Sequence, residues 1–372
     1  MSAGLSFQLS NTELNARGFG VRAAYSTAAE AVDALRSGAA SFVGGALGFD
    51  TAGPASLIAP DRVDFSPVVS TPSSAVAAPA VSRLSVTPDD VHRDRVIRAV
   101  DAIDAGRVDK VVVARSLEAE LTEPIGPGEM VDRFAATAGD STIFAADLSA
   151  APGHAGRWLI GASPELLLRK RDGIVECVPY AGSAPRFDDV GREIIGAATA
   201  LERSEKDLRE HRYVVDYLLD ALRPLCSTIT APDVPQLIAT RHVWHLATPL
   251  SAQLTDPSIT ALELAALLSP TPAVCGTPSR AAAQVIGEVE GHRDFYAGAV
   301  GWCDASGDGE WVVAIRCLEL DASGSRIQAW AGGGIVAGSD PDAEVAETTA
   351  KFQTVLSALG ASSRSRIAGL VE

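Results

Sequence analysis

Two acidic side chains and a lysine in the segment SDPDAEVAETTAKF, residues 339–352, have a spacing that could serve a chemical function. An Asp-Pro pair near the start of this segment is typical of a helix N-terminus. At helical spacing, Glu344, Glu347 and Lys351 share one face, and the apolar residues fall on another. Such a face is most often a solvated surface with a Glu–Lys pair. Neighbouring carboxylates can also hold a cation, so this segment alone leaves both interpretations open.

A second pair of acids occurs in the segment SEKDLREH, residues 204–211. Ser204 is a natural N-cap, and Asp207 and Glu210 lie three residues apart on the helix that would follow. Carboxylate pairs from two converging helices could bind a hard divalent cation such as Mg²⁺, which prefers oxygen ligands. Asp207 alone is better explained as a capping residue, and spacing alone does not show that the helices converge.

Lys110 and Glu165 are candidates for proton transfer, although each also has a structural explanation. Lys110 opens the β-branched run KVVVAR and shares a strand face with Val112 and Ala114. A lysine there either extends to solvent at the end of the sheet or is buried and reactive. Glu165, in GASPELLL, follows Pro164 and precedes an apolar run, so it could simply lie at the margin of a strand.

The charge and composition of the chain exclude several classes of function. A formal charge of −16 over 372 residues argues against nucleic-acid binding, which needs a basic stripe. The same charge would repel an anionic metabolite unless a metal ion or a few placed cations offset it. No apolar run of membrane-spanning length and no signal peptide occur, so we expect a cytoplasmic protein. The five cysteines are scattered without a CxxC pair, which predicts buried thiols rather than disulfides or a zinc site.

The pattern of apolar residues predicts an α+β protein with large, mostly antiparallel sheets, because strands come in groups with helices between them at irregular intervals. The first eighty or so residues indicate strands and turns, followed by a surface connection over residues 70–90. A helix capped by Thr87 with Pro88 at its first position should end at Gly106. The further helices are expected at residues 127–139, 204–225, 261–268 and 341–359, and the strands at 109–121, 142–148, 157–170, 173–180, 295–302, 310–320 and 326–338, the last ending in a glycine turn.

Ten separated blocks occur in one order along the chain: KVVVAR, GASPELLL, PYAGSAPR, SEKDLREH, HLATPL, PTPAVCGTP, RDFYAGAVGW, WVVAIR, AGGGIVAGSDP and EVAETTAK. In these blocks and their order the sequence resembles the chorismate-utilising enzymes, and isochorismate synthases in particular. The resemblance implies a single domain over residues 1–372, with a variable N-terminal part at 1–88 and a motif-bearing core at 89–360. It also implies two packed antiparallel sheets with helices outside and a deep Mg²⁺-dependent site.

The resemblance further implies a role for each matching residue. In isochorismate synthases water adds at C2 of chorismate as the C4 hydroxyl leaves, which requires a base and an acid on opposite ring faces. Lys110 matches the base, which must be neutral and therefore needs burial or nearby cations, and Glu165 matches the acid, which must keep its proton. The matching metal ligands are Glu210 and Glu344, with Asp207 and Glu347 in outer positions. The matching substrate-binding residues are His245, Tyr296, Arg316, Lys351, Gly182, Ser183, Gly332 and Gly334, the last two in a turn whose amides approach a carboxylate.

The same resemblance leaves alternatives open. Lys110 favours water over the ammonia used by anthranilate-type enzymes, and Ala181 replaces the lysine of aminodeoxychorismate synthases. Salicylate synthase, which also eliminates pyruvate, is the runner-up, and a non-catalytic scaffold is the alternative from another class. A monomer without a glutaminase subunit is expected. Tyr180 departs from the family, which usually has a smaller aliphatic residue there.

Overall fold

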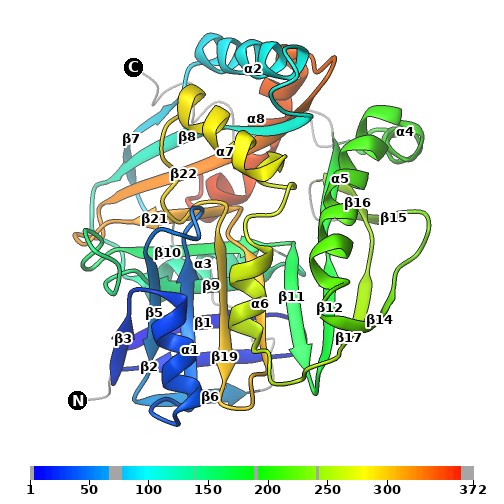
Figure 1. Cartoon of the computed structure of the whole chain (residues 1–372). Coiled ribbons are helices and arrows are strands. Elements are labelled where there is room, and N and C mark those ends of the chain that lie inside the picture. Colours follow the sequence, from blue (N-terminus) through cyan, green and yellow to red (C-terminus); the bar gives the residue numbers. More distant parts are fainter. Residues whose placement is uncertain (1–3, 67–77, 138, 188–191, 240–242, 362–372) are drawn as a thin grey trace.

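Two large antiparallel sheets pack face to face and form the body of the molecule (Figure 1). The computed structural model describes residues 4–66, 78–137, 139–187, 192–239 and 243–361. The first sheet has ten strands. Its path runs β18 (Gly276–Thr277), β8 (Lys110–Leu121), β22 (Arg326–Val336), β21 (Cys317–Leu320), β10 (Trp158–Ser163), β9 (Thr142–Asp147), β1 (Leu5–Ser10), β2 (Asn15–Phe19) and β6 (Arg62–Ser66), with β7 (Val81–Val86) also on β8.

The second sheet has nine strands and a third, smaller sheet has three. The second runs β14 (Cys226–Thr230), β17 (Leu250–Leu254), β12 (Ile174–Val178), β11 (Leu166–Arg171), β20 (Gly309–Val313), β19 (Ala299–Asp304), β4 (Phe42–Leu47), β5 (Ala55–Ala59) and β3 (Ala23–Tyr25). The third runs β13 (Tyr180–Pro185), β16 (Val243–Ala247) and β15 (Gln236–Ala239). The predicted α+β class with two packed sheets is confirmed, and the small third sheet is an addition to it.

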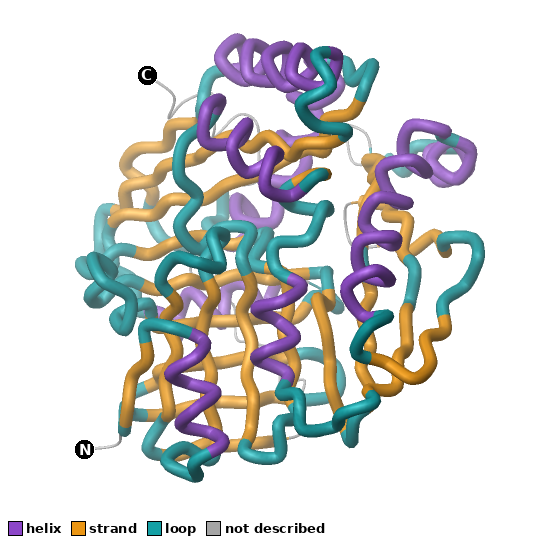
Figure 2. The backbone as a smooth tube through the Cα atoms, in the orientation of Figure 1, coloured by secondary structure: helices purple, strands orange, loops and turns teal. Residues whose placement is uncertain are grey.

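Eight helices in the described part of the chain lie outside the sheets (Figure 2). They are α1 (Ala28–Arg36), α2 (Asp89–Asp104), α3 (Pro127–Thr137), α4 (Ala197–Arg203), α5 (Glu205–Leu222), α6 (Ala261–Leu268), α7 (Ser279–Val289) and α8 (Pro341–Ala358). A second apolar cluster joins α3 and α8 to the outer face of the first sheet, whereas α5 packs on β13 of the third. No helix within these ranges combines the length and the apolar character that crossing a membrane requires.

The helix ends follow from local capping chemistry. Ser204 accepts a hydrogen bond from the backbone N–H of Asp207 at the start of α5, and Asp340 accepts two at the start of α8. The start of α2 differs from the expectation by one residue, because Pro88 rather than Thr87 is the N-cap. The Thr87 hydroxyl instead lies 3.0 Å from that of Ser116 on β8.

Two segments that read as single strands are each divided between the two large sheets. The run over 157–170 breaks at Pro164 and Glu165, so that β10 belongs to the first sheet and β11 to the second. The run over 310–320 breaks in the same way before Arg316, whose φ of 54° turns the chain from β20 into β21. Both single-strand predictions are therefore wrong. The two breaks bring Glu165 and Arg316 to one place between the sheets.

The N-terminal part of the chain is integrated into the body of the molecule. Strands β1, β2 and β6 extend the first sheet and β3, β4 and β5 the second. The prediction of only strands and turns there missed α1, whose Thr27 and Glu30 form a capping box. The surface connection expected over 70–90 is partly wrong, since β7 occupies its second half, and residues 70–77 lie outside the described residues. The expected strand at 295–302 begins only at Ala299, and all five cysteines carry free thiols.

Candidate functional site

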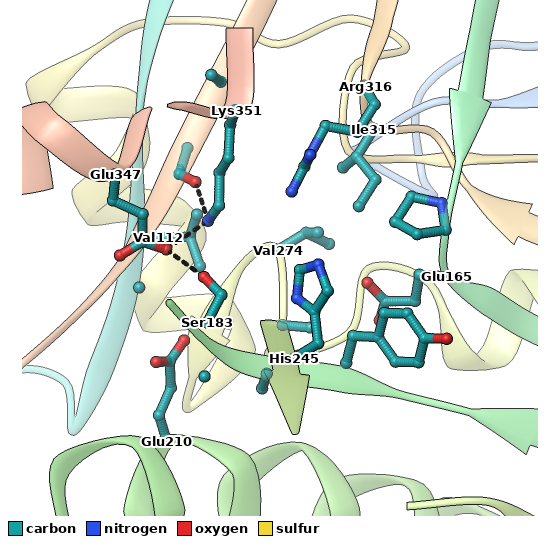
Figure 3. Close-up of a pocket in the computed structure, with 18 of the residues that line it drawn as sticks. Val112, Glu165, Ser183, Glu210, His245, Val274, Ile315, Arg316, Glu347 and Lys351 are labelled. Atoms are coloured by element: carbon teal, nitrogen blue, oxygen red, sulfur yellow. Dashed lines mark hydrogen bonds and ion pairs between the residues drawn. The ribbon is translucent and has the colours of Figure 1, made fainter. Parts of the chain in front are cut away.

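A cavity lies where the first and third sheets meet α5 and α8, beside the two breaks at Glu165 and Arg316, and its empty space, including the solvent at its mouth, is about 650 Å³. Figure 3 shows Glu347 and Lys351 from α8 and Glu210 from α5 on one side, and Glu165 across from them, with His245 and Arg316 between. The lining residues include eight predicted substrate-binding residues and three of the predicted catalytic or metal-binding ones: His245, Tyr296, Arg316, Gly332, Gly334, Lys351, Gly182, Ser183, Glu165, Glu210 and Glu347.

Three glutamates gather on one side of the site, and each is paired with a lysine. Glu210 Oε1 lies 3.0 Å from Lys110 Nζ, and Lys110 is fully buried. Glu344 Oε1 lies 2.9 Å from Lys206 Nζ. Glu347 Oε1 lies 2.6 Å from Lys351 Nζ and accepts a hydrogen bond from the Ser183 hydroxyl at 2.8 Å. The cluster therefore matches each negative charge with a positive one.

The carboxylates of this cluster also act on one another. Burial, followed by the Glu347 charge, raises the pKa of Glu344 to about 7, although Lys206 opposes the shift. Burial acts on Glu347 in the same direction, but the charge and hydrogen bond of Lys351 hold its pKa below the ordinary value. The solvated-surface interpretation of this face is therefore wrong for Glu344, which is 1% exposed.

The carboxylate oxygens of these acids are of the type that binds a hard cation, but the acids are not arranged around a common metal position. Within the described ranges, no three His, Cys, Asp or Glu side chains stand together in metal-binding geometry. Glu344 Oε2 is nevertheless a buried oxygen without a hydrogen-bond partner in the described residues, and carboxylate oxygen is the donor that Mg²⁺ prefers. Asp207 is not part of the cavity wall, and its backbone N–H donates to the hydroxyl of Ser204, which is the N-cap of α5.

The predicted glycine turn is wrong, because Gly332, Gly333 and Gly334 all lie within β22. Strand β8 pairs with β22 along its whole length, whereas β21 pairs with it only as far as Ala329, so the glycines have one open edge. The Gly332 carbonyl faces this edge, because it accepts a hydrogen bond from Lys351 Nζ at 2.8 Å. In a strand, the N–H and C=O of one residue point to the same side, and every second residue shares that side. The N–H groups of Gly332 and Gly334 therefore also face the open edge, where they can bind an anion.

The glycines are also required for space. A Cβ on Gly334 would lie 2.0 Å from Glu210 Oε1, and one on Gly333 would lie 2.5 Å from Glu344 Oε2. We therefore expect Gly334→Ala to lower the free energy of unfolding by about 1–3 kcal/mol, as overpacking does. Urea unfolding measures this. Gly287→Ala in α7 is the matched control, because a Cβ there meets nothing within 4 Å, and it should stabilise the helix instead.

Glu165 lies at the corner between β10 and β11 and is 3% exposed. Burial raises its pKa from the ordinary 4.5 to about 8, against the opposing effects of a hydrogen bond with the Tyr180 backbone and of Lys110. Glu165 is therefore protonated at neutral pH. His245 stacks on the Tyr180 ring at 5.2 Å, and its Nε2 has no partner within the described part of the chain. Burial lowers the pKa of His245 well below its ordinary value, so it is a neutral ring in the wall rather than a satisfied core histidine.

Arg316 supplies a cation that no acid in the described residues neutralises directly. Its side chain is 9% exposed and makes no hydrogen bond or ion pair there. Tyr296, also buried, stacks on Trp330 at 5.5 Å, and burial raises the pKa of its hydroxyl, which stays protonated. A buried arginine beside a tyrosine hydroxyl and open backbone amides can bind a carboxylate.

Three side chains near the site were not identified from the sequence. Lys206 is one, and the other two are Glu290 and Arg293, which pair with each other behind the cavity wall. Arg293 donates to the carbonyls of Val112 and Val274, and Glu290 accepts from the N–H of Ala114. Arg293 and Glu290 thus bind the part of β8 that lies between its pairings with β18 and with β7, on the edge opposite β22. The only signal in the sequence was an acid and an arginine three residues apart.

Comparisons with known proteins agree with this site. The family described as chorismate binding enzyme matches residues 64–360. A putative isochorismate synthase MenF of Mycobacterium tuberculosis (strain ATCC 25618 / H37Rv) is 45% identical over 351 residues, which cover 92% of each chain. Isochorismate synthase DhbC of Bacillus subtilis (strain 168) is 41% identical over 321 residues, or 85% of this chain and 80% of that one.

A solved structure extends the likeness to three dimensions. The crystal structure of a putative 2,3-dihydroxybenzoate-specific isochorismate synthase, DhbC from Bacillus anthracis, matches with a TM-score of 0.86 at 34% identity, over 96% of each chain. MenF, the menaquinone-specific isochorismate synthase from Escherichia coli, matches with a TM-score of 0.80 at 22% identity and shares the fold. The resemblance carried by the ten sequence blocks is thus confirmed. With a match that spans most of its length, the chain belongs to the chorismate-binding enzyme family.

Proposed function

We propose that this protein is an isochorismate synthase, which converts chorismate to isochorismate reversibly with the help of Mg²⁺. Relatives that carry this name at 45% and 41% identity support the proposal. The single observation that carries it is the protonated Glu165, buried across the cavity from the Lys110–Glu210 pair. Water addition on one ring face and hydroxyl loss on the other need a base and an acid so arranged.

In the proposed reaction Lys110 accepts a proton from the water that attacks C2. The ring double bonds shift, the C4–O bond breaks, and Glu165 donates its proton to the leaving hydroxyl, which departs as water. Glu165 protonated at neutral pH suits this role. In the structure Lys110 Nζ lies 3.0 Å from Glu210 Oε1, on the side of the cavity opposite Glu165.

The substrate carboxylates are proposed to bind to Arg316, Lys351, Tyr296 and the open edge of β22 at Gly332 and Gly334. These groups place cations and N–H donors inside a chain with a charge of −16, which resolves the expected repulsion of an anionic metabolite. Glu210 and Glu344, with Glu347 nearby, would hold Mg²⁺, which when bound would neutralise a substrate carboxylate. His245 and Tyr180 would form the wall beside the ring.

The remaining expectations stay proposals: a cytoplasmic monomer that acts without a glutaminase subunit. Relatives named for menaquinone synthesis and for 2,3-dihydroxybenzoate both occur, so the chemistry of this step is common to two products. Light scattering on the purified protein measures the oligomeric state.

The function is tested by incubating the purified protein with chorismate at neutral pH, with and without Mg²⁺, and identifying the products by proton NMR. We expect isochorismate in reversible equilibrium with chorismate, only when Mg²⁺ is present. Salicylate with an equal amount of pyruvate would instead assign the protein to the salicylate synthases. No turnover under either condition would favour a non-catalytic scaffold.

A further inference from the structure

The three lysines of the carboxylate cluster are not equivalent. Lys110 and Lys351 have roles in the proposed reaction, as base and as substrate ligand. Lys206 has none, although it forms the ion pair with Glu344, the most deeply buried of the three acids. A side chain without a part in the reaction that still occupies a proposed metal ligand needs an explanation.

The position of Lys206 suits a cation that can leave. It lies in the first turn of α5, next to Asp207, and its side chain is 34% exposed, whereas that of Glu344 is 1% exposed. The ammonium therefore enters the cluster from the solvent side on a flexible four-carbon stem. The other lysines are held more firmly: Lys110 is fully buried, and Lys351 also donates to the Gly332 carbonyl.

A buried carboxylate needs a positive charge close to it. An ionised group in a low-dielectric interior is costly to leave unpaired, and Lys206 Nζ at 2.9 Å is the only cation paired with Glu344 in the described residues. A metal ion bound to the same carboxylate would supply that charge itself. It would also repel an ammonium at this distance, so a metal ion on this carboxylate weakens the ion pair between Glu344 and Lys206.

We propose that Lys206 is the resident counter-cation of the metal site: it pairs with Glu344 in the metal-free protein and is displaced toward solvent when Mg²⁺ binds. This inference rests on the proposed Mg²⁺ dependence. It makes Lys206 a competitor of the metal, so the protein binds Mg²⁺ more weakly than its carboxylates alone would. If Lys206 instead helped the acids to hold the metal, its presence would make the protein bind Mg²⁺ more tightly.

The test is the affinity of the substrate-free protein for Mg²⁺ alone, measured by titration calorimetry and by the Mg²⁺-induced rise in the unfolding temperature. Lys206→Gln removes the charge and keeps a polar side chain of similar reach. We expect its Kd for Mg²⁺ to fall about five- to tenfold, because no ammonium has to be displaced. Its unfolding temperature without Mg²⁺ should fall, and saturating Mg²⁺ should restore it.

Arg209→Gln is the matched control, since it removes one positive charge from an exposed position on the same helix and should leave the Kd within about twofold of the wild-type value. Lys206→Arg keeps the charge and should bind Mg²⁺ no more tightly than the wild type. This second variant also serves if Lys206→Gln does not fold without metal.

The outcomes separate this inference from the proposed function. A Kd for Lys206→Gln that is unchanged or higher, while the wild type binds Mg²⁺, overturns the displacement of Lys206 and leaves the metal site standing. Tighter binding by Lys206→Arg also overturns it. A wild-type protein that forms isochorismate but binds no Mg²⁺ contradicts the proposed metal, and the role of Lys206 with it.

Discussion

Replacing Lys110 by methionine is expected to lower kcat for the chorismate–isochorismate conversion by about a thousandfold, the usual effect of removing a general base. Lys110 is fully buried, and methionine fills a similar volume, so the fold should persist. Because Lys110 is proposed to act on the attacking water and not to bind the substrate carboxylates, KM should change much less than kcat. The measurement is steady-state kinetics with NMR detection of both compounds, beside thermal unfolding of the variant.

Lys170 provides the control for this substitution. It is also a buried lysine, 1% exposed, and its Nζ lies 2.8 Å from an aspartate, Asp308. Asp308 does not line the cavity, whereas Glu210, the partner of Lys110, does. Lys170→Met should therefore cost stability while leaving kcat within about twofold. A Lys110→Met protein that turned over at the wild-type rate would contradict the assignment of the base.

The parts of the fold that local chemistry determines were predictable. The N-caps Ser204 and Asp340 start α5 and α8 at the expected residues, because a cap depends only on the few residues beside it. The apolar stripe of α8, with Phe352 and Val355, is buried as its spacing indicates. Strand β8 begins at Lys110 and ends at Leu121 as its β-branched run predicts.

The features that create the site depend on packing between distant segments, which no local pattern reveals. Glu165 and Arg316 lie at breaks in two apolar runs, and only Pro164 signalled one of them. Gly332 and Gly334 read as a turn by composition, yet β8 draws them into a strand by pairing along their length. Gly334 is required for the approach of the Glu210 carboxylate, and a Cβ on Gly332 would crowd Val112 and the Tyr296 hydroxyl, so neither glycine serves a turn.

The acidic cluster was likewise predictable in its local spacing but not in its three-dimensional arrangement. The spacing identified pairs of acids on two helices, but their convergence depends on how α5 and α8 pack around the open edge of β22. Glu210 approaches Gly334 and Glu344 approaches Gly333, whereas the backbone N–H of Asp207 donates to the Ser204 cap. Glu347 and Lys351 pair within α8, as their spacing indicates. Lys110 and Lys206 instead reach their acids from other elements, so these two pairings could not be seen in the sequence.

Glu165→Gln is expected to lower kcat by about a hundred- to ten-thousandfold, because glutamine cannot give a proton to the leaving hydroxyl. The wild-type pH profile provides a second readout. The pKa of Glu165 is about 8, so the acid is protonated below that pH and ionised above it. Wild-type turnover should therefore fall as the pH rises through about 8, and the residual turnover of Glu165→Gln should lack this decline.

The free energy of unfolding should also depend on the ionisation of Glu165. Its pKa in the folded protein is raised from the ordinary 4.5, so its contribution to stability is fully present below about pH 4.5 and is lost as the pH rises through about 8. Relative to the wild type, Glu165→Gln should become steadily more stable to urea over that interval. Glu319→Gln is the matched control, since Glu319 is also 3% exposed, has a pKa raised by burial and lies outside the cavity. The Glu319 variant should keep the decline in turnover above pH 8, because that decline comes from proton donation in the cavity. A decline that persisted in Glu165→Gln would assign the proton donor to another residue.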